Sequence, residues 1–117
     1  MYVSLHQSPL YPGTGLTSEG NCLNFPLPVG TDEPSYMATF SKAIDEANKF
    51  APELIAVSAG FDTYIRDPLT GLRLEISTYE KIGKAIRELG KPVFAVLEGG
   101  YSEDLPECIH NFLKGLG

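Results

Sequence analysis

The sequence predicts an α/β fold in which helices layer a parallel β-sheet, within one domain spanning residues 1–117. Short apolar segments alternate along the chain with segments whose apolar residues recur at helical spacing. Two of the apolar runs are continuous rather than alternating, which is typical of parallel strands that helices cover on both faces. The length of 117 residues suits one small domain.

The first half of the chain is predicted to hold two strands and a helix. YVSL at residues 2–5 reads as a strand, and LNFPL at residues 23–27 reads as a short extended segment in which Pro26 favours an edge position. Turn-rich stretches, SPLYPGTG and PLPVGTDEP, stand on either side of the second segment. From about residue 33, apolar residues at helical spacing predict an amphipathic helix of about 16 residues, which Pro52 bounds.

The second half repeats the alternation of strand and helix. LIAVS at residues 54–58 is predicted to be a buried parallel strand, and PVFAVLE at residues 92–98 another. Between them, STYE has the pattern of a capping box, with Ser77 as the N-cap and Glu80 three residues on. The helix that follows is expected to end at Gly90, and a last helix is expected from about residue 105 to 116.

Composition excludes several classes of function. The net charge of −6 argues against a nucleic-acid partner or an anionic membrane surface, because both require a basic patch. No apolar run approaches the ~18 residues of a membrane span, and the first residues lack the features of a signal peptide, so a cytoplasmic location is expected. Cys22 and Cys108 form no CxxC pair, and we expect them to be small buried residues rather than a disulfide.

Chemistry is expected in three loops, because ligands of parallel sheets bind beyond the carboxyl ends of the strands. These loops read HQSPLYPGTG, GFDTYIRDPLTG and EGGYSED. Asp62 directly follows the run SAGF, where a carboxylate can serve as a metal ligand or a proton acceptor. The alternative is an ordinary turn or cap aspartate.

The other two loops offer a phenol and an imidazole. In EGGY, Gly99 and Gly100 permit a sharp turn, and the Tyr101 hydroxyl can donate a hydrogen bond to an oxyanion. The alternative is a Gly-Gly turn followed by a packing tyrosine. His6 is either a catalyst or a structural hydrogen-bonding residue, and Tyr11 either walls a pocket or packs on its own loop.

The segments SLH…YPGTG, NFPLPVGT, SAGFD…DPLTGL and LEGGY occur in that order. This ordered set is similar to the C-terminal part of the catalytic domain in the histone deacetylase and acetylpolyamine amidohydrolase family. The resemblance covers nearly all of the chain but only the last third of the family's domain, so it implies a partial domain of the arginase–deacetylase fold. It also implies hydrolysis of an acetylated amine to the free amine and acetate, assisted by a metal, usually Zn²⁺.

The resemblance assigns five residues to the catalytic centre. Asp62 matches one of the family's three metal ligands, and Tyr101 matches the tyrosine that donates to the transition state. Gly99 matches the glycine whose carbonyl meets the substrate amide. Tyr11 and Leu69 match positions that wall the tunnel for the acetylated side chain.

The resemblance assigns five further residues to supporting roles. Ser4 and Leu5 match residues that hold a monovalent cation, usually K⁺, and Tyr36 matches part of a second such site. Asp67 and His6 are expected to support the loops around the centre.

The chain departs from the family pattern in one respect that bears on activity. It contains neither the Asp-x-His motif that supplies the other two metal ligands nor the His-His pair that shuttles protons, and its two histidines, His6 and His110, lie elsewhere. A catalytic zinc site needs three protein ligands. We therefore expect either a partner that supplies the missing N-terminal half or self-association through an exposed strand edge. The alternative to a completed enzyme is a non-catalytic, self-associating remnant or interaction module.

Overall fold

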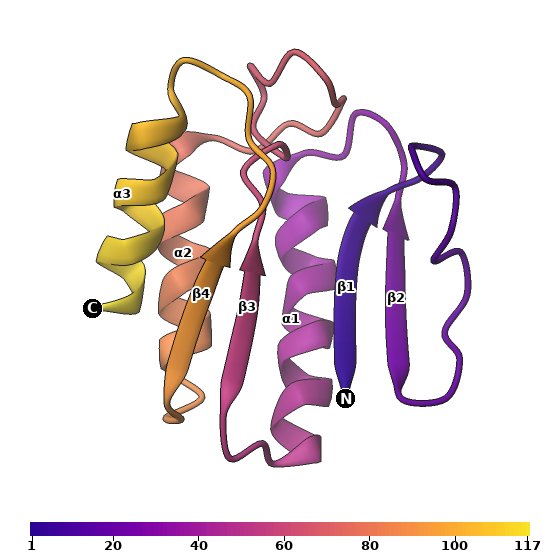
Figure 1. Cartoon of the computed structure of the whole chain (residues 1–117), viewed down its shortest axis with the longest axis vertical. Coiled ribbons are helices and arrows are strands. Elements are labelled where there is room, and N and C mark those ends of the chain that lie inside the picture. Colours follow the sequence, from indigo (N-terminus) through magenta and orange to yellow (C-terminus); the bar gives the residue numbers. More distant parts are fainter.

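The computed structural model describes all of residues 1–117 as four strands and three helices (Figure 1). In chain order they are β1 (Tyr2–Gln7), β2 (Cys22–Leu27), α1 (Glu33–Phe50), β3 (Ile55–Ala59), α2 (Ile76–Arg87), β4 (Val93–Leu97) and α3 (Leu105–Leu116). The predicted order of strands and helices is therefore confirmed. None of the three helices combines the length and the apolar composition that a membrane span needs.

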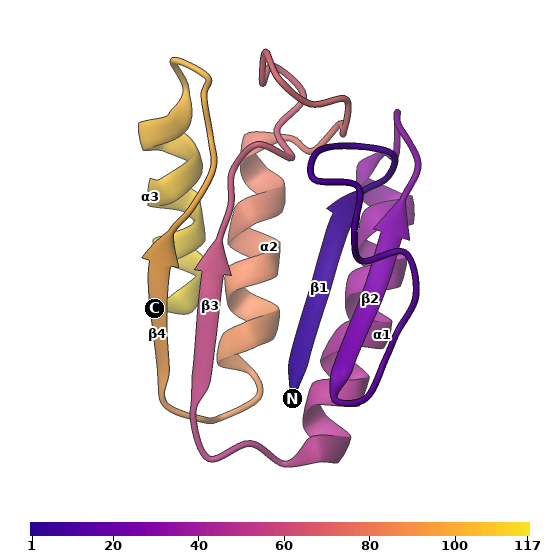
Figure 2. The ribbon, with the colours of Figure 1, turned by 45° about the vertical axis from the view of Figure 1, so that its right-hand side comes forward.

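The strands form two separate parallel pairs rather than one continuous sheet. β1 pairs with β2, and β3 pairs with β4. β1 and β3 run in the same direction but are separated by a wider gap than the strands within either pair (Figures 1 and 2), and no bridge joins them. Pro26 lies in β2 opposite His6, on an outer strand where its missing N–H interrupts no ladder, as the sequence predicted.

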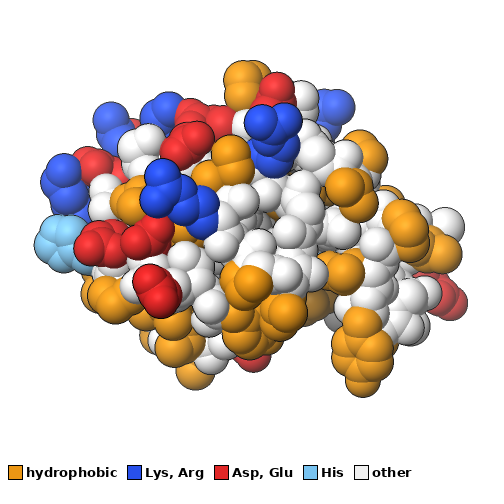
Figure 3. Space-filling model, turned by 90° about the horizontal axis from the view of Figure 1, so that it is seen from above, with side chains coloured by type: hydrophobic (Ala, Val, Ile, Leu, Met, Phe, Trp, Pro, Cys, Tyr) orange, Lys and Arg blue, Asp and Glu red, His pale blue; other side chains and the backbone are white.

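The expectation that helices cover both faces of the central strands is wrong. The helices lie behind the strands in Figures 1 and 2, and no helix covers the opposite face. On that face Phe94 is 51% exposed and Val96 is 52% exposed, and Ala56 and Ser58 of β3 are exposed as well. Seen from above, hydrophobic side chains gather along one side of the molecule and charged ones along the other (Figure 3). The continuous apolar runs therefore did not predict that one face of these strands is left uncovered.

Two helix starts show how local side chains set the boundaries. Asp32 caps α1 by accepting a hydrogen bond from the Ser35 N–H at 3.1 Å. The predicted cap of α2 is wrong, because Ser77 lies inside the helix. Glu75 is the N-cap instead, and the Thr78 hydroxyl accepts from the Glu75 N–H at 3.1 Å, so the helix begins at Ile76. Thr78, which is fully buried, takes the place in the capping box that was predicted for Glu80.

The core lies between α2, α3 and the loop that follows β3. Phe61 is 4% exposed and meets the rings of Tyr79 and Phe112 edge to face, with centroids 5.1 Å and 5.8 Å away. Cys108 is fully buried beside them and, like Cys22, is a free thiol, but Cys22 is only partly buried, so the prediction of burial is wrong for Cys22. Burial raises the pKa of the Cys108 thiol to about 11, so it behaves as a small apolar residue, as predicted.

Replacing Glu33 with glutamine should test how α1 is joined to α2. The Glu33 carboxylate accepts hydrogen bonds from the Lys81 ammonium and from the Thr78 hydroxyl, and these bonds lower its pKa. A carboxyl with a lowered pKa in the folded state stabilises the fold above its usual pKa and loses that contribution as the pH falls. We expect Glu33→Gln to cost about 1 kcal/mol at pH 7 and almost nothing at acid pH, where the native carboxyl is also protonated.

Urea denaturation at several pH values measures this difference. Glu46→Gln is the matched control, since Glu46 pairs with Lys49 at 3.0 Å on the exposed surface of α1. Equal losses of stability in the two variants, or a Glu33→Gln loss that does not change with pH, would contradict the expectation.

Candidate functional site

The candidate site lies beyond the carboxyl ends of β3 and β4. Two backbone hydrogen bonds continue the pairing past these strands: the Glu98 N–H donates to the Ala59 carbonyl at 3.0 Å, and the Phe61 N–H donates to the Gly99 carbonyl at 2.8 Å. They hold the loops that carry Asp62 and Tyr101 side by side. The Gly99 carbonyl keeps one lone pair for a further donor.

The Asp62 carboxylate lies directly over two glycines. A Cβ atom on Gly99 would lie 2.7 Å from Asp62 Oδ2, and one on Gly60 would lie 3.3 Å from Asp62 Oδ1. Any side chain at position 99 would therefore displace the carboxylate. Gly99 is needed here for close approach, which is a more specific reason than the flexible turn that the sequence suggested.

Burial and charge both act on Asp62. Partial burial raises the pKa of the Asp62 carboxyl, and the negative charge of Asp67 makes a smaller contribution in the same direction. Burial raises the pKa of Tyr36 to about 12, and the negative charge of Asp62 contributes to the increase. A bound cation would offset both the burial of the Asp62 carboxylate and its repulsion by Asp67.

Asp67 joins two of the predicted site residues through their backbones. Its Oδ1 accepts from the Leu69 N–H at 2.8 Å, and its Oδ2 accepts from the Tyr101 N–H at 3.0 Å. Asp67 is only 7% exposed, so these bonds are shielded from water. The structure thus places Asp62, Asp67, Leu69, Gly99 and Tyr101 in one cluster.

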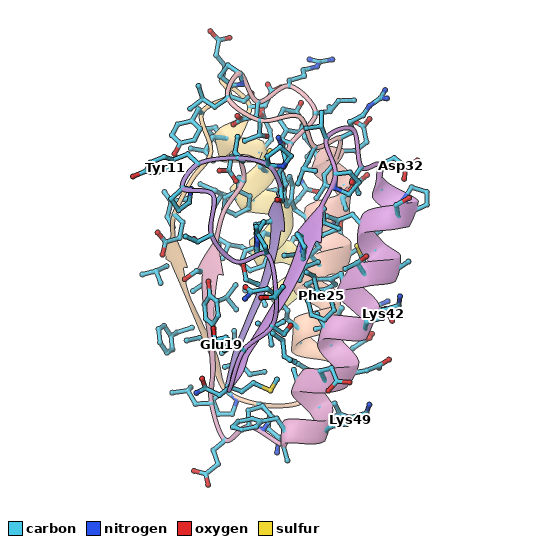
Figure 4. All side chains as sticks on the ribbon, turned by 90° about the vertical axis from the view of Figure 1, so that its right-hand side faces the viewer. Tyr11, Glu19, Phe25, Asp32, Lys42 and Lys49 are labelled. Atoms are coloured by element: carbon cyan, nitrogen blue, oxygen red, sulfur yellow. The ribbon has the colours of Figure 1, made fainter.

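The side chains expected to meet a substrate are exposed. Tyr101 is 57% exposed, Leu69 is 61% exposed and Tyr11 is 94% exposed. Figure 4 shows Tyr11 on the strand side of the molecule, pointing away from α1. The structure does not bring Tyr11 against the Asp62 cluster, so any tunnel needs further walls.

The residues of β1 that were assigned to a cation or to support lie apart from this cluster. His6 donates from Nε2 to the Gly15 carbonyl at 2.9 Å, which leaves Nδ1 to accept from the Ser4 hydroxyl at 2.9 Å. Leu5 packs against the core. His6 therefore holds the loop after β1, while His110 is exposed on α3.

Two supporting residues were missed by sequence reasoning. The Thr70 hydroxyl donates to the Asp62 carbonyl, and the Gly71 N–H donates to Gln7 Oε1 at 2.7 Å. The second bond ties the loop after β3 to the end of β1. A threonine eight positions from Asp62 and a glutamine on another strand carry no sequence signal for these contacts, since both depend on the tertiary fold.

The residues present do not form a zinc site by themselves. A catalytic zinc site uses three protein ligands, and no group of three or more His, Cys, Asp or Glu side chains is placed to hold a metal ion. Asp67 is occupied by two backbone donors, which leaves Asp62 as the one free carboxylate of the cluster. Two further ligands would have to come from other residues.

Comparison with known proteins points to one family. The model of the histone deacetylase domain matches residues 1–116. The chain is 39% identical over 115 residues to a probable deacetylase of Archaeoglobus fulgidus, covering 87% of this chain and 32% of that protein. It is 32% identical over 128 residues to the acetylpolyamine amidohydrolase of Burkholderia pseudomallei, covering all of this chain and 38% of that protein.

Comparison with solved structures points to the same family. The crystal structure of acetylpolyamine aminohydrolase from Burkholderia pseudomallei matches with a TM-score of 0.93 and 31% identity, covering 100% of this chain and 37% of that one. The HDA15 HD domain matches with a TM-score of 0.90 and 30% identity, covering 99% and 36%. These structures have the arginase–deacetylase fold that the sequence resemblance implied, and the chain spans about a third of the length of the relatives it matches.

Proposed function

The chain belongs to the histone deacetylase family, and on that premise we propose that it supplies part of the centre of an amidohydrolase acting on an acetylated amine. A second part, carrying an Asp-x-His motif and a His-His pair, completes the centre. The observation that carries the proposal is the half-buried Asp62 carboxylate, which lies over Gly99 and has a raised pKa. Burial of an uncompensated carboxylate is unfavourable, and a cation shared with further ligands would offset the cost.

The two proposed functional groups have different tasks. Asp62 would supply one of three ligands to Zn²⁺, the metal that the family resemblance suggests. Tyr101 follows Gly99 and Gly100, and its backbone is fixed by Asp67, so its exposed hydroxyl is free to donate to the oxygen that gains negative charge during amide hydrolysis. These 117 residues offer no general base for the attacking water, which is why the completing part is required.

Co-expression tests the proposal. We expect the chain alone to bind no stoichiometric zinc and to leave acetyl-lysine peptides and acetylputrescine uncleaved. When it is co-expressed with the part of Burkholderia pseudomallei acetylpolyamine amidohydrolase that it does not match, in the presence of Zn²⁺, acetate should be released. Tyr101→Phe in the complex should reduce kcat by about 10²–10³-fold.

Two outcomes separate this proposal from its alternative. Asp62→Asn should abolish both zinc binding and hydrolysis by the complex, whereas Asp45→Asn, on the exposed side of α1, should change neither. Hydrolysis by the unaccompanied chain, or full activity of the Asp62→Asn complex, would refute the proposed division of the centre.

A second candidate function is a non-catalytic module that associates with itself. The exposed apolar side chains of β4 favour it, since Phe94 and Val96 are both more than half exposed on a face without helices. A sizing column would then show a homo-oligomer. Replacing Phe94 and Val96 with threonine should return it to a monomer, and a chain that is monomeric without these changes would exclude this candidate.

The remaining expectations are also proposals. A cytoplasmic location is supported by two free thiols, Cys22 and Cys108, since a reducing compartment preserves thiols, and cell fractionation would test it. Binding of K⁺ by Ser4, Leu5 and Tyr36 stays a prediction from the family resemblance.

A further inference from the structure

We propose that Tyr64 is a positioning residue for Tyr101, and that it acts by binding Asp104 at the far end of the loop that carries Tyr101. The inference rests on the proposed function in one respect, because it concerns the geometry in which Tyr101 would act. It is carried by a buried hydrogen bond, by the conformation of Asp104 and by the way in which the Tyr101 loop, residues 98–104, is attached.

One hydrogen bond joins the end of the Tyr101 loop to the loop that follows β3. The Tyr64 hydroxyl donates to Asp104 Oδ2 at 2.7 Å. Tyr64 is 3% exposed, and the side chain of Asp104 is 33% exposed. Because a carboxylate accepts this bond and the donor is buried, the bond is stronger than one between neutral groups at the surface.

The backbone on both sides of Tyr64 is fixed by Leu74, which is fully buried. The Leu74 N–H donates to the Thr63 carbonyl at 3.1 Å, and the Leu74 carbonyl accepts from the Ile65 N–H at 2.8 Å. Tyr64 therefore offers its hydroxyl from a segment that is anchored independently of the Tyr101 loop.

Asp104 stands at the N-cap of α3 without capping the helix. The N-cap of α1, Asp32, has an extended backbone with a ψ of 175° and accepts from the Ser35 N–H at 3.1 Å. Asp104 has a similar φ of −84° but a ψ of 6°, and its side chain makes no cap bond. The Glu107 N–H, which an aspartate cap would bond, has no partner in the chain. The carboxylate thus gives up the usual role of its position and binds Tyr64 instead.

The other neighbour of the Asp104 carboxylate interacts more weakly. Arg66 Nη1 lies 3.8 Å from Asp104 Oδ2, and the Arg66 side chain is 76% exposed. This distance is too long for a hydrogen bond, and an exposed ion pair contributes little. The Tyr64 hydroxyl is therefore the contact that decides where the Asp104 carboxylate lies, and Arg66 supplies a matched control.

The Tyr101 loop is attached to the loop after β3 at three places, above the ends of β3 and β4 (Figures 1 and 2). The Gly99 carbonyl accepts from the Phe61 N–H at 2.8 Å, and the Tyr101 N–H donates to Asp67 Oδ2 at 3.0 Å. The bond from Tyr64 is the third attachment, and it holds the end of the loop.

The third attachment has no substitute, because no other hydrogen bond joins residues 102–104 to the loop after β3. Without it, rotation of the Asp104 backbone toward the extended conformation of a cap would redirect the segment that carries Tyr101. The loop after β3 also carries Asp62. The Tyr64 bond therefore preserves the distance between the proposed metal ligand and the proposed donor to the oxyanion, and reaction rates depend steeply on such distances.

Kinetics of the completed complex test the inference. Tyr64→Phe removes the hydroxyl and keeps the buried ring. In the complex with Zn²⁺ and the unmatched part of the Burkholderia pseudomallei enzyme, this variant should lower kcat for acetyl-lysine peptides about tenfold. KM should stay within about twofold of the wild type, since the transition state alone is affected. Rates are expressed per bound zinc, so that a smaller folded fraction is not mistaken for a lower kcat.

Variants of the two partners of Tyr64 and Arg66 separate this bond from general effects. Asp104→Asn keeps an oxygen that can accept from the Tyr64 hydroxyl and should keep kcat within about threefold of the wild type, whereas Asp104→Ala should match Tyr64→Phe. Arg66→Gln removes only the ion pair and should change kcat by less than about twofold. Tyr64→Phe combined with Asp104→Ala should be no slower than either single variant, because both changes break the same bond.

Amide hydrogen exchange of the chain alone, without zinc or substrate, separates the inference from the proposed function. In Tyr64→Phe the Tyr101 amide should exchange about fivefold faster or more, since one end of its loop is released. Amides in the α2–α3 core should change only as much as the measured change in global stability allows. If Tyr64→Phe does not fold, Asp104→Ala breaks the same bond from a side chain that is already 33% exposed and gives the same comparison.

The remaining outcomes refute one idea at a time. Hydrolysis by the wild-type complex with an unchanged kcat in Tyr64→Phe would overturn the inference and leave the proposed function standing. A combined variant much slower than both single variants would also overturn it, because the two residues would then act separately. A wild-type complex without hydrolysis, together with faster exchange of the Tyr101 amide in Tyr64→Phe, would refute only the proposed function and support the attachment of the loop by Tyr64.

Discussion

Replacing Gly83 with alanine should lower the free energy of unfolding by about 3 kcal/mol and the Tm by about 12 °C. Gly83 lies where α2 crosses α3, and a Cβ atom there would stand 2.4 Å from the Phe112 carbonyl oxygen and 2.9 Å from the Leu116 nitrogen. Both neighbours are backbone atoms, so no side chain can move aside. The two helices would have to separate by about 1 Å to restore ordinary contact at 3.4 Å.

The expected sign is opposite to that of helix propensity. Alanine in place of glycine stabilises an unconstrained helix by about 1 kcal/mol. The energetic cost of the clash must therefore exceed this gain for the variant to be destabilised. Ser41→Ala, at an exposed position of α1, is the control for propensity alone and should change stability by less than about 0.5 kcal/mol. Urea and thermal denaturation measure both variants. A Gly83→Ala protein as stable as the wild type would show that the crossing is looser than the structure indicates.

Local patterns in the sequence were sufficient to predict the order of elements. Helical spacing identified α1, α2 and α3, and turn residues such as Gly90 and Pro52 marked their ends. The pairing of strands could not be predicted in the same way, because register and neighbours depend on contacts between distant segments. The apolar composition of β3 and β4 indicated two covered faces, and the structure covers only one. Composition alone does not show which face of a strand the chain itself covers, because the covering residues come from distant segments.

The candidate site was predictable where its residues follow strand ends. Asp62 and Tyr101 belong to short motifs at the ends of β3 and β4, and parallel strands bring such ends together. The supporting contacts of Thr70 and Gln7, and the two hydrogen bonds that Asp67 accepts, were not predictable because they depend on how the loops fold back. The cap of α2 was mislocated for a similar reason. STYE fits the local pattern, but Thr78 pairs with Glu75 in the capping box and also donates to Glu33 of α1, and the helix begins at Ile76.

Replacing Asp67 with asparagine should cost about 2–3 kcal/mol and release the Tyr101 loop. The aspartate accepts from two buried backbone donors, whereas an asparagine amide has one oxygen and can accept from only one of them in the same pose. The other N–H is left without a partner, which costs about 1–3 kcal/mol, and the bond that remains loses the strength of a charged acceptor. Urea denaturation measures the loss, and exchange of the Leu69 and Tyr101 amides shows which bond has broken.

Asp67 could either stabilise the fold alone or also position Tyr101, and these two roles predict different results for Asp67→Asn. If Asp67 positions Tyr101, the Tyr101 or Leu69 amide should exchange at least tenfold faster in Asp67→Asn. Amides in the α2–α3 core should exchange only as fast as the lowered global stability of the variant allows. Positioning also predicts that, in the completed complex, kcat falls while KM for acetyl-lysine peptides changes little, since the Tyr101 hydroxyl acts on the transition state. Asp45→Asn removes an exposed carboxylate of α1 and should change neither quantity. If both loop amides keep their protection in Asp67→Asn, the carboxylate does not fix the tyrosine, and Tyr101 must be held by the completing part instead.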